Sequence, residues 1–306
     1  MIKKIIVAFF LTASLSAYSA PIVVPVVWPF SVGSNQVNFA RSIIEEANKQ
    51  QKKYTFVIEF KPGAGGAIAA RHVENYNGTA ILYSSASFFS RPVFYPNESH
   101  KTENFKPVYI ACVGQPYSIV GTKLKTLDDI RKQDRVTIGA NFGSITEAMA
   151  RELQILAPNT SVDVIPFASG TLGPAQELIA GRLDLNVSLP SDTVQWLELD
   201  KVTIVGSTGT KDYKYFKTFH SQGIKGFESM VGSYAMYIPS STNPKTVEEL
   251  HNIMAKGATA AGAKLQEYYA LDYCPGVNYT FKQTNDVYNN WLKYWPEKLS
   301  KLKVGS

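Results

Sequence analysis

The chain has 306 residues, of which 45% are hydrophobic and 18% are charged, and its formal net charge is +6. That length and apolar content are enough for two domains of ordinary size. The basic residues are scattered along the chain and form no basic run, which argues against a nucleic-acid-binding protein.

The first 20 residues have the pattern of a secretory signal peptide. Lys3 and Lys4 precede an apolar run at residues 5–11, and small residues at 17–20 mark a cleavage site. No cysteine lies near this site, so we expect an exported protein that is not a lipoprotein. Removing the signal takes away two lysines and no acids, and the net charge falls to +4. No later stretch has the roughly 20 apolar residues of a transmembrane helix.

The next segment repeats a plan of strand, loop and helix. Residues 22–27 form a β-branched apolar run, which predicts a strand that is covered on both faces in a parallel sheet. A turn-rich loop and a helical pattern at residues 39–48 follow. Residues 54–71 repeat the plan, and residues 80–83 predict a third strand with a serine-rich loop after it. Ligands of open α/β sheets bind where such loops converge, at the carboxyl ends of the strands.

The loop KPGAGGAIAAR, at residues 61–71, joins the second predicted strand to its helix. Gly63, Gly65 and Gly66 permit positive φ angles, and the first turn of a helix leaves N–H groups without intrahelical partners. We therefore expect an anion site here; the alternative is a glycine turn that only packs the helix against its strand. The loop matches neither a P-loop nor a dinucleotide-binding fingerprint.

A second α/β unit is predicted from Thr126, a hydroxyl cap followed by two acidic residues. Its predicted strands are at residues 136–140, 162–167, 183–187 and 202–205, and its helices are at 145–156 and 173–180.

Residues 230–239 predict a strand that leaves this unit, and the remaining chain has helical patterns at residues 242–257, 265–272 and 285–303. The second unit is therefore inserted into the first. We expect domain 1 to comprise residues 21–118 and 231–306, and domain 2 to comprise residues 119–230. Two crossings between domains form a hinge beside a ligand cleft.

The two cysteines of the chain, Cys112 and Cys274, leave two possibilities open. They can pair in an exported protein, but they are far apart in sequence, and two buried free thiols are the alternative. No catalytic pattern is recognisable, because the four histidines lack metal-ligand spacing and no nucleophile elbow occurs. We therefore expect no metal, no cofactor and no catalysis.

Several short blocks occur in a defined order along the chain. They are Pro29-Phe30, residues 62–66 (PGAGG), Tyr83-Ser84-Ser85, residues 179–184 (IAGRLD) and residues 226–228 (GFE). Together with the export signal, they resemble the Bug family, the extracytoplasmic substrate-binding proteins of tripartite tricarboxylate transporters. The resemblance implies a periplasmic, monomeric, two-domain α/β protein of the Venus-flytrap type, similar to type II binding proteins. Its lobes, joined by two crossover strands, would close on a small organic acid.

The resemblance also implies a carboxylate site made of short polar groups and backbone amides. The candidates from the first domain are Phe30, Ser31, Gly33, Ser34, Asn35, Ser84, Ser85 and Ser87. The candidates from the second domain are Asn141, Gly143, Ser144, Thr146, Ser169, Gly170, Thr171 and Ser188. No catalytic or metal-ligating residue is among them.

Two departures from the family pattern bear on the ligand. The family commonly has an aspartate where this chain has Val37, and several members have an acid near the position of Ser188. A buried ligand ammonium would need an acidic partner. We therefore predict a carboxylate that lacks an α-amino group.

The loops predicted to form the cleft also carry five phenylalanines. Two interpretations are open: they contact an aromatic or largely apolar acid, or they pack at the ends of the sheets. They are Phe30, Phe88, Phe89, Phe142 and Phe167. The predicted partners are the membrane components of the transporter. A periplasmic ligand sensor for a receptor kinase and an exported enzyme acting on carboxylic acids are the alternative functions.

Overall fold

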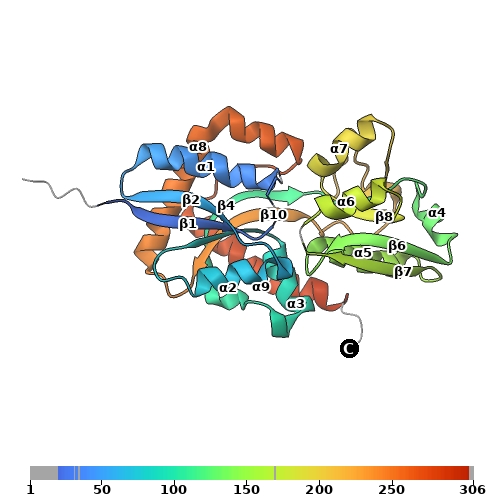
Figure 1. Ribbon diagram of the computed structural model, residues 1–306, viewed down its shortest axis with the longest axis horizontal. Coiled ribbons are helices and arrows are strands. Elements are labelled where there is room, and N and C mark those ends of the chain that lie inside the picture. The colour runs from blue at the N-terminus through green and yellow to red at the C-terminus, as the bar shows by residue number, and fades with distance from the viewer. Residues whose placement is uncertain (1–19, 31, 34, 169, 303–306) are drawn as a thin grey trace, which may run out of the picture.

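The computed structural model describes residues 20–30, 32–33, 35–168 and 170–302, in which two five-stranded mixed sheets form two lobes (Figure 1). The first sheet has the strand order β2-β1-β3-β10-β4. Its strands are β1 (Ile22–Trp28), β2 (Tyr54–Phe60), β3 (Ile81–Ser85), β4 (Phe105–Gln115) and β10 (Gly232–Pro239). Strands β1, β2 and β3 are parallel, and β10 runs antiparallel to β3 and β4. The predicted parallel core around residues 22–27 is thereby confirmed.

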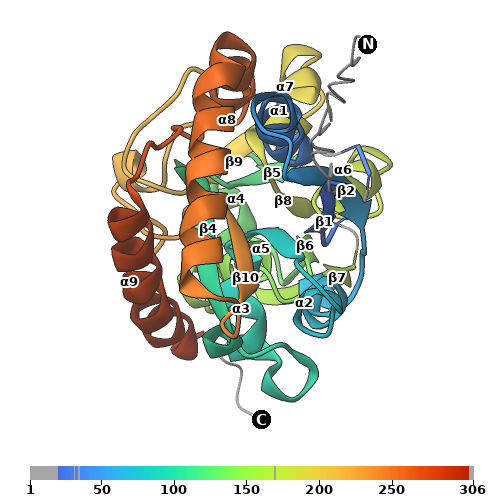
Figure 2. The same ribbon diagram turned by 90° about the vertical axis from the view of Figure 1, so that its left-hand side faces the viewer.

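Helices cover both faces of the first sheet. Its helices are α1 (Gln36–Gln50), α2 (Ala67–Glu74), α3 (Ser87–Phe94), α8 (Pro244–Leu271) and α9 (Phe281–Ser300). Helices α1 and α8 pack together over one face, and α2, α3 and α9 lie over the other (Figure 1). Both α8 and α9 contact the edge strand β4 (Figure 2), and the segment after α8 pairs with this edge through a bridge between Cys112 and Gly276.

The second sheet has the strand order β7-β6-β8-β5-β9. Its strands are β5 (Ser118–Gly121), β6 (Arg135–Asn141), β7 (Ser161–Phe167), β8 (Leu185–Ser188) and β9 (Thr203–Ser207). Its helices are α4 (Leu127–Arg131), α5 (Ile145–Leu156), α6 (Leu172–Ile179) and α7 (Pro190–Glu198). The chain enters this lobe between β4 and β5 and leaves it between β9 and β10. Two mixed sheets joined in this way are the predicted fold class, while the domain boundaries themselves stay a prediction.

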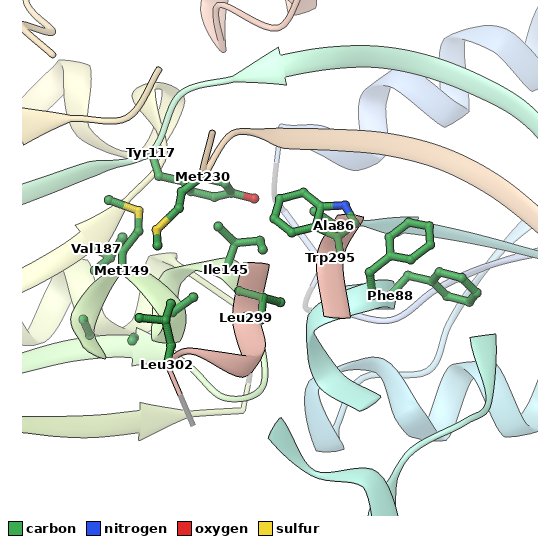
Figure 3. Close-up of a cluster of buried hydrophobic side chains, with 14 of the residues drawn as sticks. Ala86, Phe88, Tyr117, Ile145, Met149, Val187, Met230, Trp295, Leu299 and Leu302 are labelled. Carbon is green, nitrogen blue, oxygen red and sulfur yellow. The ribbon is translucent and has the colours of Figure 1, made fainter. Parts of the chain in front are cut away.

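The last helix, α9, and the residues just after it pack against both lobes. Leu299 and Leu302 belong to one hydrophobic cluster with Ile145 and Met149 of α5 (Figure 3). The Lys298 Nζ also donates a hydrogen bond of 3.2 Å to the carbonyl oxygen of Gly226. The C-terminal helix therefore stabilises both lobes, although the sequence assigns it to the first domain.

Four elements differ from the sequence prediction. The helical patterns at residues 242–257 and 265–272 belong to one element, α8, which is interrupted at Gly262, where φ is 44°. Helix α9 begins at Phe281 because Thr280 and Gln283 form a capping box. Helices α3 and α7 were not predicted. Pro190 at the start of α7 is compatible with a helix because the first helical residue needs no N–H partner.

Cys112 and Cys274 form a disulfide bond, with their Cα atoms 5.7 Å apart. Both residues are fully buried. The alternative of two free thiols is therefore wrong. The bond joins β4 to the segment after α8 and encloses the whole second lobe within the loop that it closes.

His100 is a buried histidine in the first lobe, with only 5% of its surface exposed. Its ring stacks on Phe88, with the ring centroids 4.7 Å apart, and its Nε2 lies 2.9 Å from the Phe88 carbonyl oxygen. Burial lowers the pKa of His100 to about 4, and the hydrogen bond to Phe88 opposes this shift. The native protein therefore holds His100 in its neutral form at neutral pH.

We expect this burial to make the protein less stable in mild acid. Between pH 6.5 and pH 4 the unfolded chain protonates His100 while the native chain does not, so this contribution is present above pH 6.5 and is lost as the pH falls. Loss of this contribution should lower the free energy of unfolding by about 2 kcal/mol between pH 7 and pH 5. Urea denaturation of wild type and His100→Gln at both pH values measures it. Equal pH dependence in the two proteins would contradict the prediction.

Candidate functional site

A cavity opens between the two lobes, with about 520 Å³ of empty space including its opening to solvent. Residues of both lobes and of the crossing between them line it. They are Trp28, Phe30, Gln36, Ser85, Ser87, Tyr117, Asn141, Ser144, Thr146, Gly170, Thr171, Leu172, Leu189, Asp192 and Tyr234. Trp28, Ser85 and Asn141 are the last residues of β1, β3 and β6, so the cavity lies at the carboxyl ends of parallel strands. This is where open α/β sheets bind ligands.

The N-terminal ends of five helices meet at this cavity. Gln36 and Ser87 begin α1 and α3, whereas Ser144, Thr171 and Leu189 are the N-cap residues of α5, α6 and α7. All five residues line the cavity. A helix N-terminus carries a partial positive charge and N–H groups without intrahelical partners. The arrangement therefore favours an anion, although no lysine, arginine or histidine is among the described lining residues.

Hydrogen bonds fix the hydroxyl groups on the second-lobe side of the cavity. The Ser144 Oγ lies 2.7 Å from the Thr146 Oγ1 and donates to the Asn141 carbonyl oxygen at 2.7 Å. The Asn141 side-chain oxygen accepts from the Gly170 N–H at 3.2 Å. On the first-lobe side, the Ser85 Oγ donates to the Ser87 Oγ at 2.9 Å. These groups are held in place before a ligand arrives, which lowers the entropic cost of binding.

Two buried aspartates lie at one end of the site. Asp192, in the first turn of α7, lines the cavity and accepts a short hydrogen bond from the Thr171 hydroxyl. Burial raises the pKa of Asp192 to about 6; the Thr171 hydrogen bond opposes the shift, and the charge of Asp272 adds to it. Burial also raises the pKa of Asp272, which its hydrogen-bond donors oppose.

Asp272, at the end of α8, connects the lobes beside the cavity. It accepts hydrogen bonds from the side-chain amides of Asn35 and Gln36, each at 2.9 Å, and from the Ser191 N–H at 3.2 Å. Gln36 also donates to the Ser191 Oγ at 3.2 Å. Asn35 and Gln36 belong to the first lobe and Ser191 to the second, so these bonds hold the two lobes together.

The sequence-predicted site residues fall into three groups. The residues that line the cavity are Phe30, Ser85, Ser87, Asn141, Ser144, Thr146, Gly170 and Thr171. Those that do not line it are Gly33, Asn35, Ser84, Gly143 and Ser188. Ser31, Ser34 and Ser169 lie outside the described residues. The roles of all these candidates in ligand binding stay predictions.

The residues outside the lining have other surroundings. Ser84 precedes Ser85 in β3, so its side chain lies on the opposite face of the sheet. Ser188 is buried within the second lobe. Gly143 packs against Arg91 of the first lobe, and Asn35 binds Asp272. Of the five phenylalanines noted in the sequence, only Phe30 is among the described lining residues, so packing accounts for the other four.

The glycine loop at residues 61–71 is not part of the cavity lining. It has the predicted course from β2 through a short 3₁₀ turn into α2, and its three glycines have positive φ angles. A Cβ at Gly65 would lie 2.4 Å from the carbonyl oxygen of Phe142 in the second lobe. The expectation of an anion site at this loop therefore stays a prediction, and it does not concern the cavity described above. Gly65 allows a close approach between the lobes.

Sequence reasoning missed Asp192, Gln36 and Asp272. Asp192 directly follows the hydroxyl-rich segment at residues 188–191, and a helix start at Pro190 would have placed it in the first turn. An acid therefore lines the cavity although Val37 and Ser188 are not acidic, and the ligand class stays a prediction. Asp272 has no comparable local signal. Its partner Ser191 is 81 positions away along the chain, and Gln36 and Asn35 are 236 and 237 positions away.

Across residues 20–30, 32–33, 35–168 and 170–302, no cluster of histidine, cysteine and acidic side chains could bind a metal ion. In the same part of the chain, no helix has the length and apolar character needed to cross a membrane.

Solved structures with the same fold cover nearly the whole chain. The periplasmic binding protein BugD has 23% sequence identity and a TM-score of 0.78, covering 92% of this chain and 97% of its own. MatC from Rhodopseudomonas palustris, with bound malate, has 19% identity and a TM-score of 0.74, covering 92% of this chain and 99% of its own. R. palustris Rpa4515, with adipate, has 18% identity and a TM-score of 0.77, covering 93% of this chain and 97% of its own.

These likenesses show a two-lobed periplasmic binding protein fold. No curated protein matches the sequence significantly. The family model described as the tripartite tricarboxylate transporter family receptor, TctC, matches residues 39–285. That match covers most of the chain, and the family consists of solute-binding proteins. The chain therefore belongs to the TctC family of tripartite tricarboxylate transporter receptors, as its resemblance to Bug proteins implies.

Proposed function

We propose that this protein captures a small organic acid in the cavity between its lobes and delivers it to the membrane components of a tripartite tricarboxylate-type transporter. The observation that carries the proposal is the meeting of five helix N-termini at a cavity whose described lining has no cationic side chain. Such a site stabilises a carboxylate through dipoles and hydrogen bonds. The protein works as a monomer in the periplasm, which it reaches through its signal peptide without lipidation.

The favoured ligand is a carboxylate without an α-amino group. Malate and adipate, which occupy two related structures, are both diacids without an amino group. These two ligands support this ligand class.

A thermal-shift screen of the mature protein tests the proposal. The panel contains succinate, malate, adipate, citrate, benzoate, aspartate and glutamate. A ligand that binds only the native state raises its apparent stability by mass action. We expect a saturable rise in Tm with one or more acids that lack an amino group, and chromatography should recover the ligand unchanged.

Two results would contradict the proposal. No shift with any acid would remove the basis for carboxylate capture. Tighter binding of aspartate than of succinate, measured by calorimetry, would overturn the ligand class but leave carboxylate capture standing.

A further inference from the structure

Asp192 is the one charged side chain among the described residues that line the cavity. Only 9% of its surface is exposed, so water screens its charge poorly. An incoming ligand carboxylate would share this small, poorly screened space with a second negative charge. Two carboxylates that share a buried site do not both remain ionised, and one of them takes up a proton.

Hydrogen-bond donors distinguish Asp192 from Asp272, the second buried acid at this end of the site. Asp272 accepts from Asn35, Gln36 and Ser191, and each of these bonds stabilises its ionised form. Within the described part of the chain, Asp192 accepts only from Thr171. Asp192 is therefore the easier of the two acids to protonate, and it is also the one that the ligand can contact.

The other titratable groups among the described residues that line the cavity do not supply a positive charge. They are Tyr117, in the crossing between the lobes, and Tyr234 of β10, and burial raises the pKa of both. These tyrosines therefore remain neutral throughout the physiological pH range. Asp272 adds a further negative charge nearby, which also favours protonation of Asp192.

We propose that the protein captures its ligand together with one proton from solvent, and that the protonated carboxyl of Asp192 donates its O–H to a carboxylate oxygen of the ligand. The inference rests on the proposed function, because it takes the ligand to be a carboxylate. It makes Asp192 a specificity-determining residue for acidic ligand groups. The only species transferred is one proton, which passes from solvent to the Asp192 carboxylate.

Protonation of Asp192 has only a small free-energy cost at neutral pH. Burial raises the pKa of Asp192 to about 6, so protonating it at pH 7 reduces affinity by about tenfold. A hydrogen bond between a carboxyl O–H and a carboxylate is among the short, strong ones. It offsets this reduction and also removes the repulsion between two negative charges.

Isothermal titration calorimetry at pH 7 in phosphate and in Tris buffer measures the protons exchanged on binding. The probe is whichever of succinate, malate and adipate binds most tightly. We expect the wild-type protein to take up close to one proton per ligand, and its Kd should rise about tenfold between pH 7 and pH 8. Asp192→Asn keeps an N–H donor without needing a proton, so its proton uptake should be near zero and its Kd nearly independent of pH.

Glu152→Gln is the matched control. Glu152 is another partly buried acid whose pKa is raised by burial, but it is not among the lining residues. This variant should take up as many protons as the wild type. Equal uptake by Asp192→Asn and the wild type would overturn the proposal.

The wild-type measurement decides the question even where a variant fails to fold. Binding without proton uptake at pH 7 would overturn the role of Asp192 alone. Loss of binding by Asp192→Asn at every pH, with no proton uptake by the wild type, would instead show that an ionised Asp192 pairs with a donor on the ligand. Failure of all three acids to bind either protein would overturn the proposed function itself.

Discussion

Replacing both Cys112 and Cys274 with alanine should lower the free energy of unfolding by about 4 kcal/mol and Tm by about 10 °C. The two residues are 162 positions apart, so the disulfide closes a long loop and restricts the unfolded chain strongly. Both side chains are fully buried, and the bond joins the sheet of the first lobe to the segment that carries Asp272. Urea and thermal unfolding under non-reducing conditions measure the loss.

The two single variants separate the cross-link from the packing of the sulfur atoms. Either Cys112→Ala or Cys274→Ala alone removes the bond, so each should lose nearly as much stability as the double variant. If packing were responsible, the two single effects would be small and would add up to the effect of the double variant. Additive losses would therefore contradict the cross-link argument.

Gly143→Ala should weaken ligand binding by about tenfold, because it disturbs the contact between the lobes. A Cβ at Gly143 would lie 2.3 Å from the Cδ of Arg91, far inside van der Waals contact. Arg91 is fully buried between the rings of Tyr95 and Phe142, 4.3 and 4.2 Å from their centroids, and cannot easily move away. A tenfold change in affinity corresponds to about 1.4 kcal/mol of interlobe contact.

Hydrogen bonds at Gly143 connect the same two lobes. Its carbonyl oxygen accepts from the Ser90 hydroxyl of α3 at 2.7 Å, and its N–H donates to the Glu147 carboxylate at 2.6 Å. Glu147 in turn accepts from the Tyr95 hydroxyl at 2.8 Å. A shift of the loop that relieves the clash would therefore break several bonds together. Calorimetry with the best acid of the screening panel measures the loss of affinity.

Gly181→Ala is the matched control for Gly143→Ala. The φ angles of the two glycines are 73° and 74°, so alanine introduces about the same backbone strain, on the order of 1–2 kcal/mol, at both positions. No atom lies within 4 Å of a Cβ built at Gly181. This variant should lose stability but keep its affinity for the ligand. Equal affinity in the two variants would contradict a role for the Gly143 contact in binding.

Local sequence signals predicted most strands and helices to within a few residues. Helix α5 has the predicted bounds, and Thr126 and Asp129 form a capping box where the sequence places a cap. Periodicity and capping depend on neighbouring residues, so a single sequence reveals them. Helix α7 was missed because Pro190 and the hydroxyls around it also suit a loop, and the surrounding packing decides between the two.

The resemblance to Bug proteins implied the site candidates, and eight of them line the cavity. Several of these follow parallel strands, whose carboxyl ends meet at one edge of a sheet whatever the details of packing. The glycine loop at residues 61–71 shows the limit of the argument. Its backbone has the predicted form, but Phe142 of the other lobe occupies the position next to Gly65.

The sequence by itself therefore determined the fold class, because strand and helix patterns are local, and the resemblance of its short blocks indicated the family. Only the tertiary structure decided which charges the site contains. Gln36 and Asp272 are 236 positions apart, and Asp192 belongs to the other lobe. Their burial and their hydrogen-bond donors arise when the two lobes meet, and burial sets the pKa values on which the chemistry of the cavity depends.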